Sequence, residues 1–213
     1  MRRYLLLFTL ILICLPSYAQ KKHLDFKGIP LDGPYNQFVA SLQRLGFKTD
    51  KPFPYGPFFS DNPYSECSVL ILSTMASHTV YGINVSMRNT KEGDFNDFVE
   101  LYKKKYGQPR LYYSNGNPYN HELNRSKRAI DSSSLNNIND NDSGSYYAVF
   151  NNSYGEITIT LNIEVRKTFV KNKLTRTDKN YSLSVAYNDA VNSVLNKNEM
   201  KNAQDISNNI KDI

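Results

Sequence analysis

The stretch "NSYGEITITLNIEV", residues 152–165, carries the clearest structural signal in the chain. An Asn-x-Tyr-x-Glu pattern with a glycine predicts a turn at its start. Apolar residues then fall on every second position, which is typical of a β-strand with one face toward a core. We therefore expect a strand from residue 156 to 165, with inward-facing Ile157, Ile159, Leu161, Ile163 and Val165.

The same pattern occurs earlier, in "NPYSEC" at residues 62–67. It leads into an apolar stretch, "ECSVLILST", in which Cys67, Val69 and Ile71 share one face. Since its other face is also largely apolar, we expect a central strand there. The repetition has two explanations, an internal duplication or coincidence in a chain rich in Asn and Tyr, and the duplication hypothesis gains from further matches in the same order.

A helix is expected before each copy of the pattern. Residues 32–46 have Asp32 or Gly33 as a cap, Pro34 at the first helical position and Gly46 after the end. Residues 94–107 have Asp94 as a cap and Gly107 after the last turn. The expected apolar stripes are Phe38, Val39, Leu42 and Leu45 in the first helix, and Phe95, Phe98, Val99, Tyr102 and Tyr106 in the second.

These elements predict an α+β fold made of two helix-plus-three-strand (αβββ) repeats with antiparallel sheet. The first unit covers residues 20–91 and the second 92–188. Besides the two strands above, alternation indicates strands near 58–59, 79–87, 146–150 and 181–187. The sequence leaves open whether the strands form one continuous sheet or two.

The second unit is the longer one. It has 56 positions from Asn96 to Asn152, against 26 from Asn36 to Asn62, and the excess is a polar insertion at 114–145. Such a composition buries too little apolar surface to order itself well, although a short helix is expected at 122–130. Residues 189–213 predict a short helix, with Val191, Val194 and Leu195 as its apolar residues, followed by a polar tail.

The first twenty residues, "MRRYLLLFTLILICLPSYAQ", have the order of a secretory signal: basic residues, a short apolar run and a small-residue site. We expect cleavage near Ala19 and export to the periplasm or the medium. The alternative is a lipoprotein acylated at Cys14, but Ile13 precedes it where lipoprotein processing requires Gly or Ala. The mature chain would have 194 of the 213 residues and a formal charge of +4, because Arg2 and Arg3 are removed from a total of +6. No later segment of the sequence is apolar for long enough to span a bilayer, so we expect no transmembrane segment in the mature chain.

No group of residues predicts a catalytic, cofactor or metal site. The histidines, His23, His78 and His121, are not at ligand spacing from one another. Cys67 is a nucleophile only if a base lies beside it, and its place in an alternating strand favours a buried, inert thiol. There is neither a nucleophile-elbow nor a phosphate-loop motif.

Positive charge is concentrated in "RKTFVKNKLTRTDKN", residues 166–180, between the last two expected strands. Export argues against nucleic acid, so the expected partners are another envelope protein or an anionic surface polymer. The alternative is that the lysines only keep an edge hairpin soluble and unpaired. The candidate contact residues for an anionic partner are Arg166, Lys167, Lys171, Lys173, Arg176 and Lys179.

The segments "DFKGIPLDGPYNQFVASLQRLGF", "DFVELYKKKYGQP" and "YSLSVAYNDAVN", with the strand that carries Cys67, resemble secreted Gram-negative bacterial proteins of unknown function. More distantly, a helix and a small antiparallel sheet used twice resembles the beta-lactamase-inhibitor protein architecture and the small lipoprotein of outer-membrane assembly. The resemblance implies a fold that works by binding proteins. We therefore expect a non-enzymatic protein- or envelope-binding module, with a hydrolase of cell-envelope material as the alternative.

Overall fold

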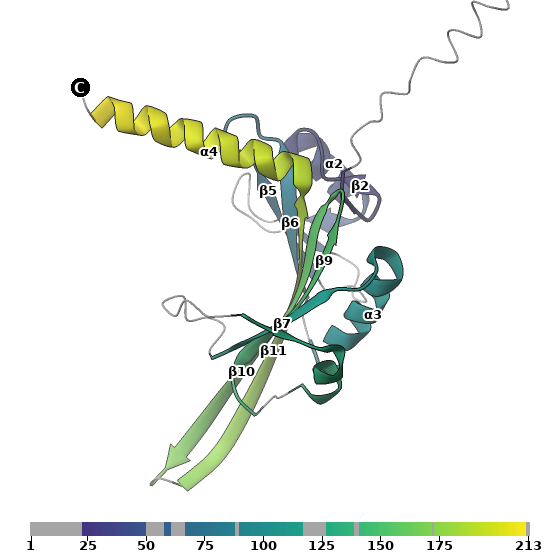
Figure 1. The fold of residues 1–213 in the computed structure, drawn as a ribbon, viewed down its shortest axis with the longest axis vertical. Helices are drawn as coiled ribbons and strands as arrows, with labels where there is room; N and C mark the ends of the chain where they lie inside the picture. Colours follow the sequence, from purple (N-terminus) through teal and green to yellow (C-terminus); the bar gives the residue numbers. More distant parts are fainter. Residues whose placement is uncertain are drawn as a thin grey trace, which may run out of the picture.

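The computed structural model describes residues 23–49, 58–60, 67–87, 90–116, 127–138, 141–171 and 173–211. Figure 1 shows an α+β fold in which helices pack against a large antiparallel sheet. The helices are α2 (Tyr35–Arg44), α3 (Asp94–Tyr106), α4 (Ala190–Lys211) and the short 3-10 helix η1 (Ser132–Asn137). The strands are β1 (Asp25–Phe26), β2 (Ile29–Pro30), β3 (Phe47–Lys48), β4 (Phe58–Ser60), β5 (Cys67–Ser73), β6 (Val80–Met87), β7 (Arg110–Asn115), β8 (Arg128–Ile130), β9 (Gly144–Asn152), β10 (Gly155–Val170) and β11 (Lys173–Asp189).

Nine of the described strands form one continuous sheet, in the order β3-β4-β5-β6-β11-β10-β9-β7-β8. Strands β1 and β2 form a separate small hairpin. The question of one sheet or two is therefore answered in favour of one. The junction is the antiparallel pairing of β6 with β11. A row of register partners crosses that junction through Val69, Val85, Val185, Ile159 and Ala148, all of them buried.

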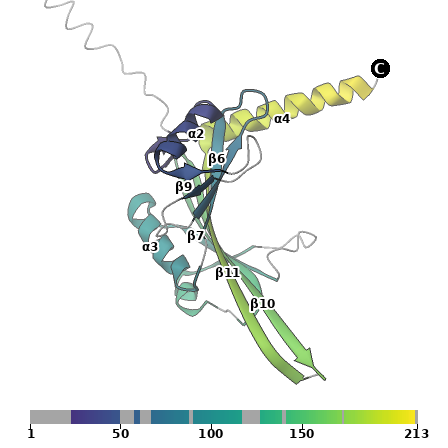
Figure 2. The same cartoon turned by 180° about the vertical axis from the view of Figure 1, so that it is seen from behind.

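Two helices cover the same face of this sheet (Figures 1 and 2). Helix α2 buries Phe38 and Leu42, and α3 buries Phe95 and Val99, all at 2 % exposure or less. The alternation expected for residues 156–165 is confirmed, since Ile157, Ile159, Leu161 and Ile163 are each fully buried in this core. On the opposite face Leu70 of β5 is 41 % exposed, so β5 has the expected central place in the sheet but does not bury this apolar side chain.

Helix α4 is much longer than the short helix expected after residue 189. It begins where β11 ends, and the buried Asp189 accepts hydrogen bonds from the backbone N–H groups of Val191 and Asn192 at 3.0 Å. The Asn192 amide donates to the carbonyls of Leu31 and Val80. These hydrogen bonds fix the first turn of α4, and the exposed second half of the helix extends from it (Figure 1). None of the described helices has the length and apolar character that would carry it across a bilayer.

Several local expectations are wrong. Residues 128–130 of the supposed helix at 122–130 form β8, while 121–126 lie outside the described residues. Parts of the insertion at 114–145 are ordered, because β7, β8, η1 and β9 all include residues from it. Leu45, placed in the apolar stripe of the first helix, is 48 % exposed because α2 ends at Arg44.

Candidate binding surface

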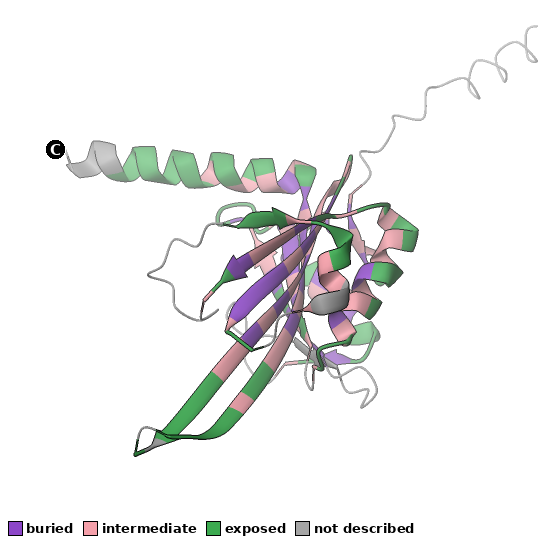
Figure 3. Ribbon diagram, turned by 60° about the horizontal axis from the view of Figure 1, so that its bottom comes forward, coloured by how far each residue is buried: buried purple, intermediate pink, exposed green. Residues whose placement is uncertain are grey.

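The two longest strands leave the sheet together as a two-stranded ribbon. Strand β9 pairs with β10 only from Gly155 to Ile163, and β6 pairs with β11 only from Leu183 to Asn188. Beyond these points, and among the strands that the structure describes, β10 and β11 pair only with each other. We call residues 164–171 and 173–180 the ribbon, and Figure 3 shows that its outer part is exposed on both strands.

All six basic residues singled out in the sequence lie on the ribbon with exposed side chains: Arg166, Lys167, Lys171, Lys173, Arg176 and Lys179. Its acidic residues are Glu164 and Asp178. Six cations against two anions leave a formal charge of +4, which equals the charge expected for the whole mature chain. The ribbon is therefore a concentrated patch of positive charge on a projecting element.

Arg166, Lys167 and Arg176 make ion pairs with described acidic residues. The Arg166 guanidinium donates to Glu164 from Nε at 3.0 Å and from NH2 at 3.1 Å. Arg176 Nε lies 2.7 Å from Asp178, and Lys167 Nζ lies 3.4 Å from Asp142. Pairs this exposed each contribute about 0 to 1 kcal/mol and weaken with salt. Across the described residues, no ion pair involves Lys171 or Lys173.

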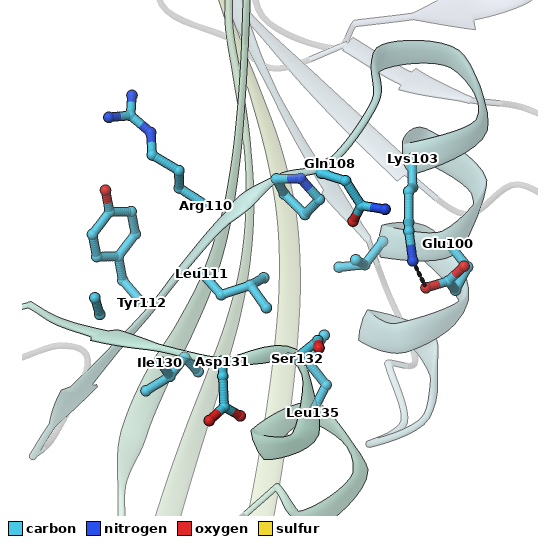
Figure 4. A pocket seen from close by; sticks show the side chains of 13 residues that line it. Glu100, Lys103, Gln108, Arg110, Leu111, Tyr112, Ile130, Asp131, Ser132 and Leu135 are labelled. Carbon is cyan, nitrogen blue, oxygen red and sulfur yellow. Dashed lines mark hydrogen bonds and ion pairs between the residues drawn. The ribbon is translucent and has the colours of Figure 1, made fainter.

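A cavity of about 390 Å³ lies between α3, β7 and the β8–η1 segment (Figure 4). Its charged lining is largely committed to local structure. Lys103 lies 3.1 Å from Glu100 one helical turn away. Asp131 caps η1, and hydrogen bonds from Ser133 and Ser134 hold the pKa of this carboxyl below its usual range. Asp131 is therefore an anion at neutral pH and is poorly suited to donate a proton to a leaving group.

A second hollow, of about 420 Å³, lies between the β1–β2 hairpin and α3. The hydroxyls of Tyr102 and Tyr187 are hydrogen-bonded there, and burial raises the pKa of both phenols. The pKa of Lys105 is also raised, by its hydrogen bond to Tyr106 and by the nearby Asp25. These groups therefore keep their ordinary charge states at neutral pH, and none of them becomes a nucleophile or a general base.

The thiol and the histidines have structural surroundings. Cys67 is 6 % exposed, and burial raises the pKa of its thiol, which makes the nucleophilic thiolate scarcer. His23 lines a cavity but has its Nδ1 atom 3.0 Å from the buried Asp189 carboxylate. His78 is a turn residue with φ 50°, and its carbonyl accepts the Tyr35 N–H. His121 lies outside the described residues.

Sequence reasoning located the basic residues but missed the shape that presents them. Strands were expected only at 156–165 and 181–187, with residues 166–180 as a long hairpin between them, whereas β10 has 16 residues and β11 has 17 and together they take in nearly all of that hairpin. The available signal was the β-branched and aromatic character of "TFV" and "LTRT", which continues strand propensity beyond Val165. The cavity beside α3 was not predicted, because β8 and η1, which form one of its walls, come from the polar insertion. No grouping of three or more metal-ligating side chains occurs among the residues that the structure describes.

Comparison with known proteins adds no relative to this picture: no protein-family model, no curated protein and no solved structure matches the chain.

Proposed function

We propose that this chain is an exported, non-enzymatic binding module that uses the ribbon to contact an anionic partner in the cell envelope. The observation that carries the proposal is the projection of a two-stranded ribbon of charge +4 beyond the sheet. Binding proteins often carry their contact residues on surface segments that a rigid scaffold positions. Charge complementarity of this kind raises association rates and makes binding sensitive to salt.

Two further observations support the proposal. The N-terminal sequence has the features of a secretory signal, so the partner would be found outside the cytoplasm. The resemblance to the beta-lactamase-inhibitor and outer-membrane-assembly architectures also favours a protein that works by binding. The hydrolase alternative draws no support from Asp131 or Cys67, because their pKa values are shifted away from those that a general acid or a thiolate nucleophile needs.

The test compares three forms of the mature chain, beginning at Gln20. One is unmodified, one has Lys171, Lys173 and Arg176 replaced by Gln, and the control loses three exposed lysines elsewhere (Lys104→Gln, Lys197→Gln and Lys201→Gln). Each is used to capture partners from envelope extract at several salt concentrations, and is also run on immobilised heparin as a defined polyanion. Both readouts should weaken for the ribbon variant and remain for the control. Equal behaviour of the two variants would contradict the proposal.

We also infer that the sheet consists of two duplicated halves, each a helix followed by four strands rather than three. The strand order supports this, since α2 with β3, β4, β5 and β6 on one side corresponds to α3 with β7, β9, β10 and β11 on the other. Val69 and Ile159, the register partners of Val85 and Val185, are 90 residues apart. The same offset separates Asn62 from Asn152, although residues 62–66 lie outside the described part. Superposition of the halves in experimental coordinates is the test, and a best fit that does not pair β5 with β10 would contradict the duplication.

A further inference from the structure

The end of the ribbon carries an exposed apolar pair. Phe169 and Leu174 are register partners on the two strands, next to an irregularity between Thr168 and Phe169. Their side chains are 59 % and 48 % exposed. A single exposed apolar residue is ordinary on a protein surface. Here, however, an aromatic and an aliphatic side chain face each other at the far end of a projecting element, where the core is out of reach.

Cations surround this pair. Lys171 lies in the turn, Lys173 is the first residue of β11, and Lys167 lies two positions before Phe169. The acidic residues of the ribbon, Glu164 and Asp178, are near its root and are already engaged by arginines. The tip, which we define as Phe169, Lys171, Lys173 and Leu174, is therefore apolar at its centre and positive around it.

We propose that the tip inserts into the interfacial region of an anionic phospholipid bilayer. Phe169 and Leu174 would enter the boundary between headgroups and acyl chains, while Lys171 and Lys173 contact lipid phosphates. This inference rests on the proposed function, because it names the anionic partner of the ribbon. A soluble polyanion would use the lysines but leave the apolar pair in water, whereas a bilayer accommodates both kinds of side chain at different depths.

The geometry allows the contact. Seven residues of β10, 164–170, extend past the last pairing with β9, and at about 3.4 Å per residue they carry the tip about 20 Å beyond that point. The tip therefore reaches a surface without bringing the bulk of the sheet against it. Each lysine near an anionic membrane strengthens binding about fivefold. We expect burial of part of the Phe169 and Leu174 side chains to add about tenfold.

The chain contains no tryptophan, which allows a site-specific test. Phe169→Trp in the mature chain introduces a single fluorophore at the tip. On vesicles of phosphatidylglycerol and phosphatidylcholine, its emission should shift to the blue and become protected from acrylamide quenching. The control is Met75→Trp, at a 68 % exposed position in the β5–β6 turn at the other end of the molecule, which should show neither change. Vesicle binding without a blue shift at position 169 would overturn insertion.

A second pair of variants separates this inference from the proposed function. Phe169→Ser with Leu174→Ser should reduce vesicle partitioning about tenfold and leave heparin retention unchanged, whereas Lys171→Gln with Lys173→Gln should reduce both. If the serine variant binds vesicles as well as the unmodified chain, insertion is wrong while the proposed function stands. If the chain captures an envelope protein but ignores anionic vesicles, the partner is a protein and the lipid inference is also wrong. If the lysine variant matches the unmodified chain in every assay, both are wrong.

Discussion

Replacement of Asp189 by Ala should destabilise the fold more than the loss of one ordinary polar side chain. Asp189 is fully buried and connects three parts of the molecule. One carboxylate oxygen caps α4 through the N–H groups of Val191 and Asn192. The other accepts the Leu24 N–H at 3.1 Å and lies 3.0 Å from Nδ1 of His23. The side chain thus holds both the start of α4 and the segment that leads into β1.

The magnitude follows from these contacts. Loss of a helix cap costs about 1 kcal/mol. A buried N–H left without an acceptor, here that of Leu24, costs about 1 to 3 kcal/mol. We therefore expect Asp189→Ala to lower the free energy of unfolding by about 3 kcal/mol. Asp189→Asn should cost less, about 1 to 2 kcal/mol, because Asn caps helices as well as Asp but turns an amide donor toward Leu24.

Urea denaturation followed by circular dichroism measures these differences, with Asp205→Ala as the control. Asp205 is an exposed residue on the same helix, and its replacement should change the free energy of unfolding by less than about 0.5 kcal/mol. If Asp189→Ala unfolds within 0.5 kcal/mol of the unmodified protein, the reasoning about this buried carboxylate is refuted.

Three other predictions concern single positions. Gly155→Ala should destabilise by about 1 to 3 kcal/mol in urea denaturation, because its Cβ would overlap a facing backbone carbonyl, whereas Gly93→Ala has open space and should be neutral. The Ser77 hydroxyl and the Ala76 N–H donate hydrogen bonds to Glu199, which connect α4 to the β5–β6 turn and lower the pKa of Glu199. This contact is complete at neutral pH, and it is lost as the pH falls through and below the usual glutamate pKa of about 4.3. The protection factors of the amides in the second half of α4, which are corrected for the intrinsic pH dependence of exchange, should therefore fall on acidification in the unmodified chain, and should already be low at pH 7 in Glu199→Gln. Phe95→Ala removes a fully buried ring of α3 and should cost about 3 to 5 kcal/mol, measured by the same urea assay.

The part of the fold that could be predicted is the part governed by local periodicity. Helix α3 begins at Asp94 and ends at Tyr106, close to the limits given by its cap and by Gly107, because an apolar stripe and a glycine mark its extent. The strand at 156–165 could be predicted equally well, since its alternating isoleucines all face one core. The order of the strands in the sheet was beyond reach, because pairing between distant segments leaves no local signal.

The errors came from judging segments by polarity alone. The chain after residue 195 reads as a polar tail, yet α4 continues to Lys211. Asn is only about 0.7 kcal/mol worse than Ala in a helix, and the costly step of helix formation is its first turn. Asp189 and Asn192 fix that first turn, so the following residues need only propagate it.

The charges of the ribbon divide into two groups, and this division explains how such an element can exist. A two-stranded ribbon is marginally stable in water without a third strand. Near the root, Arg166 and Arg176 are paired with acidic neighbours on the ribbon, which reduces repulsion where the strands leave the sheet. Lys171 and Lys173, at the tip, have no such ion pair among the described residues, so their charge contributes repulsion rather than stability until an anion approaches. The positive charge of the tip is therefore better explained by binding than by folding, and the same holds for the exposed pair Phe169 and Leu174, which has no core to pack against.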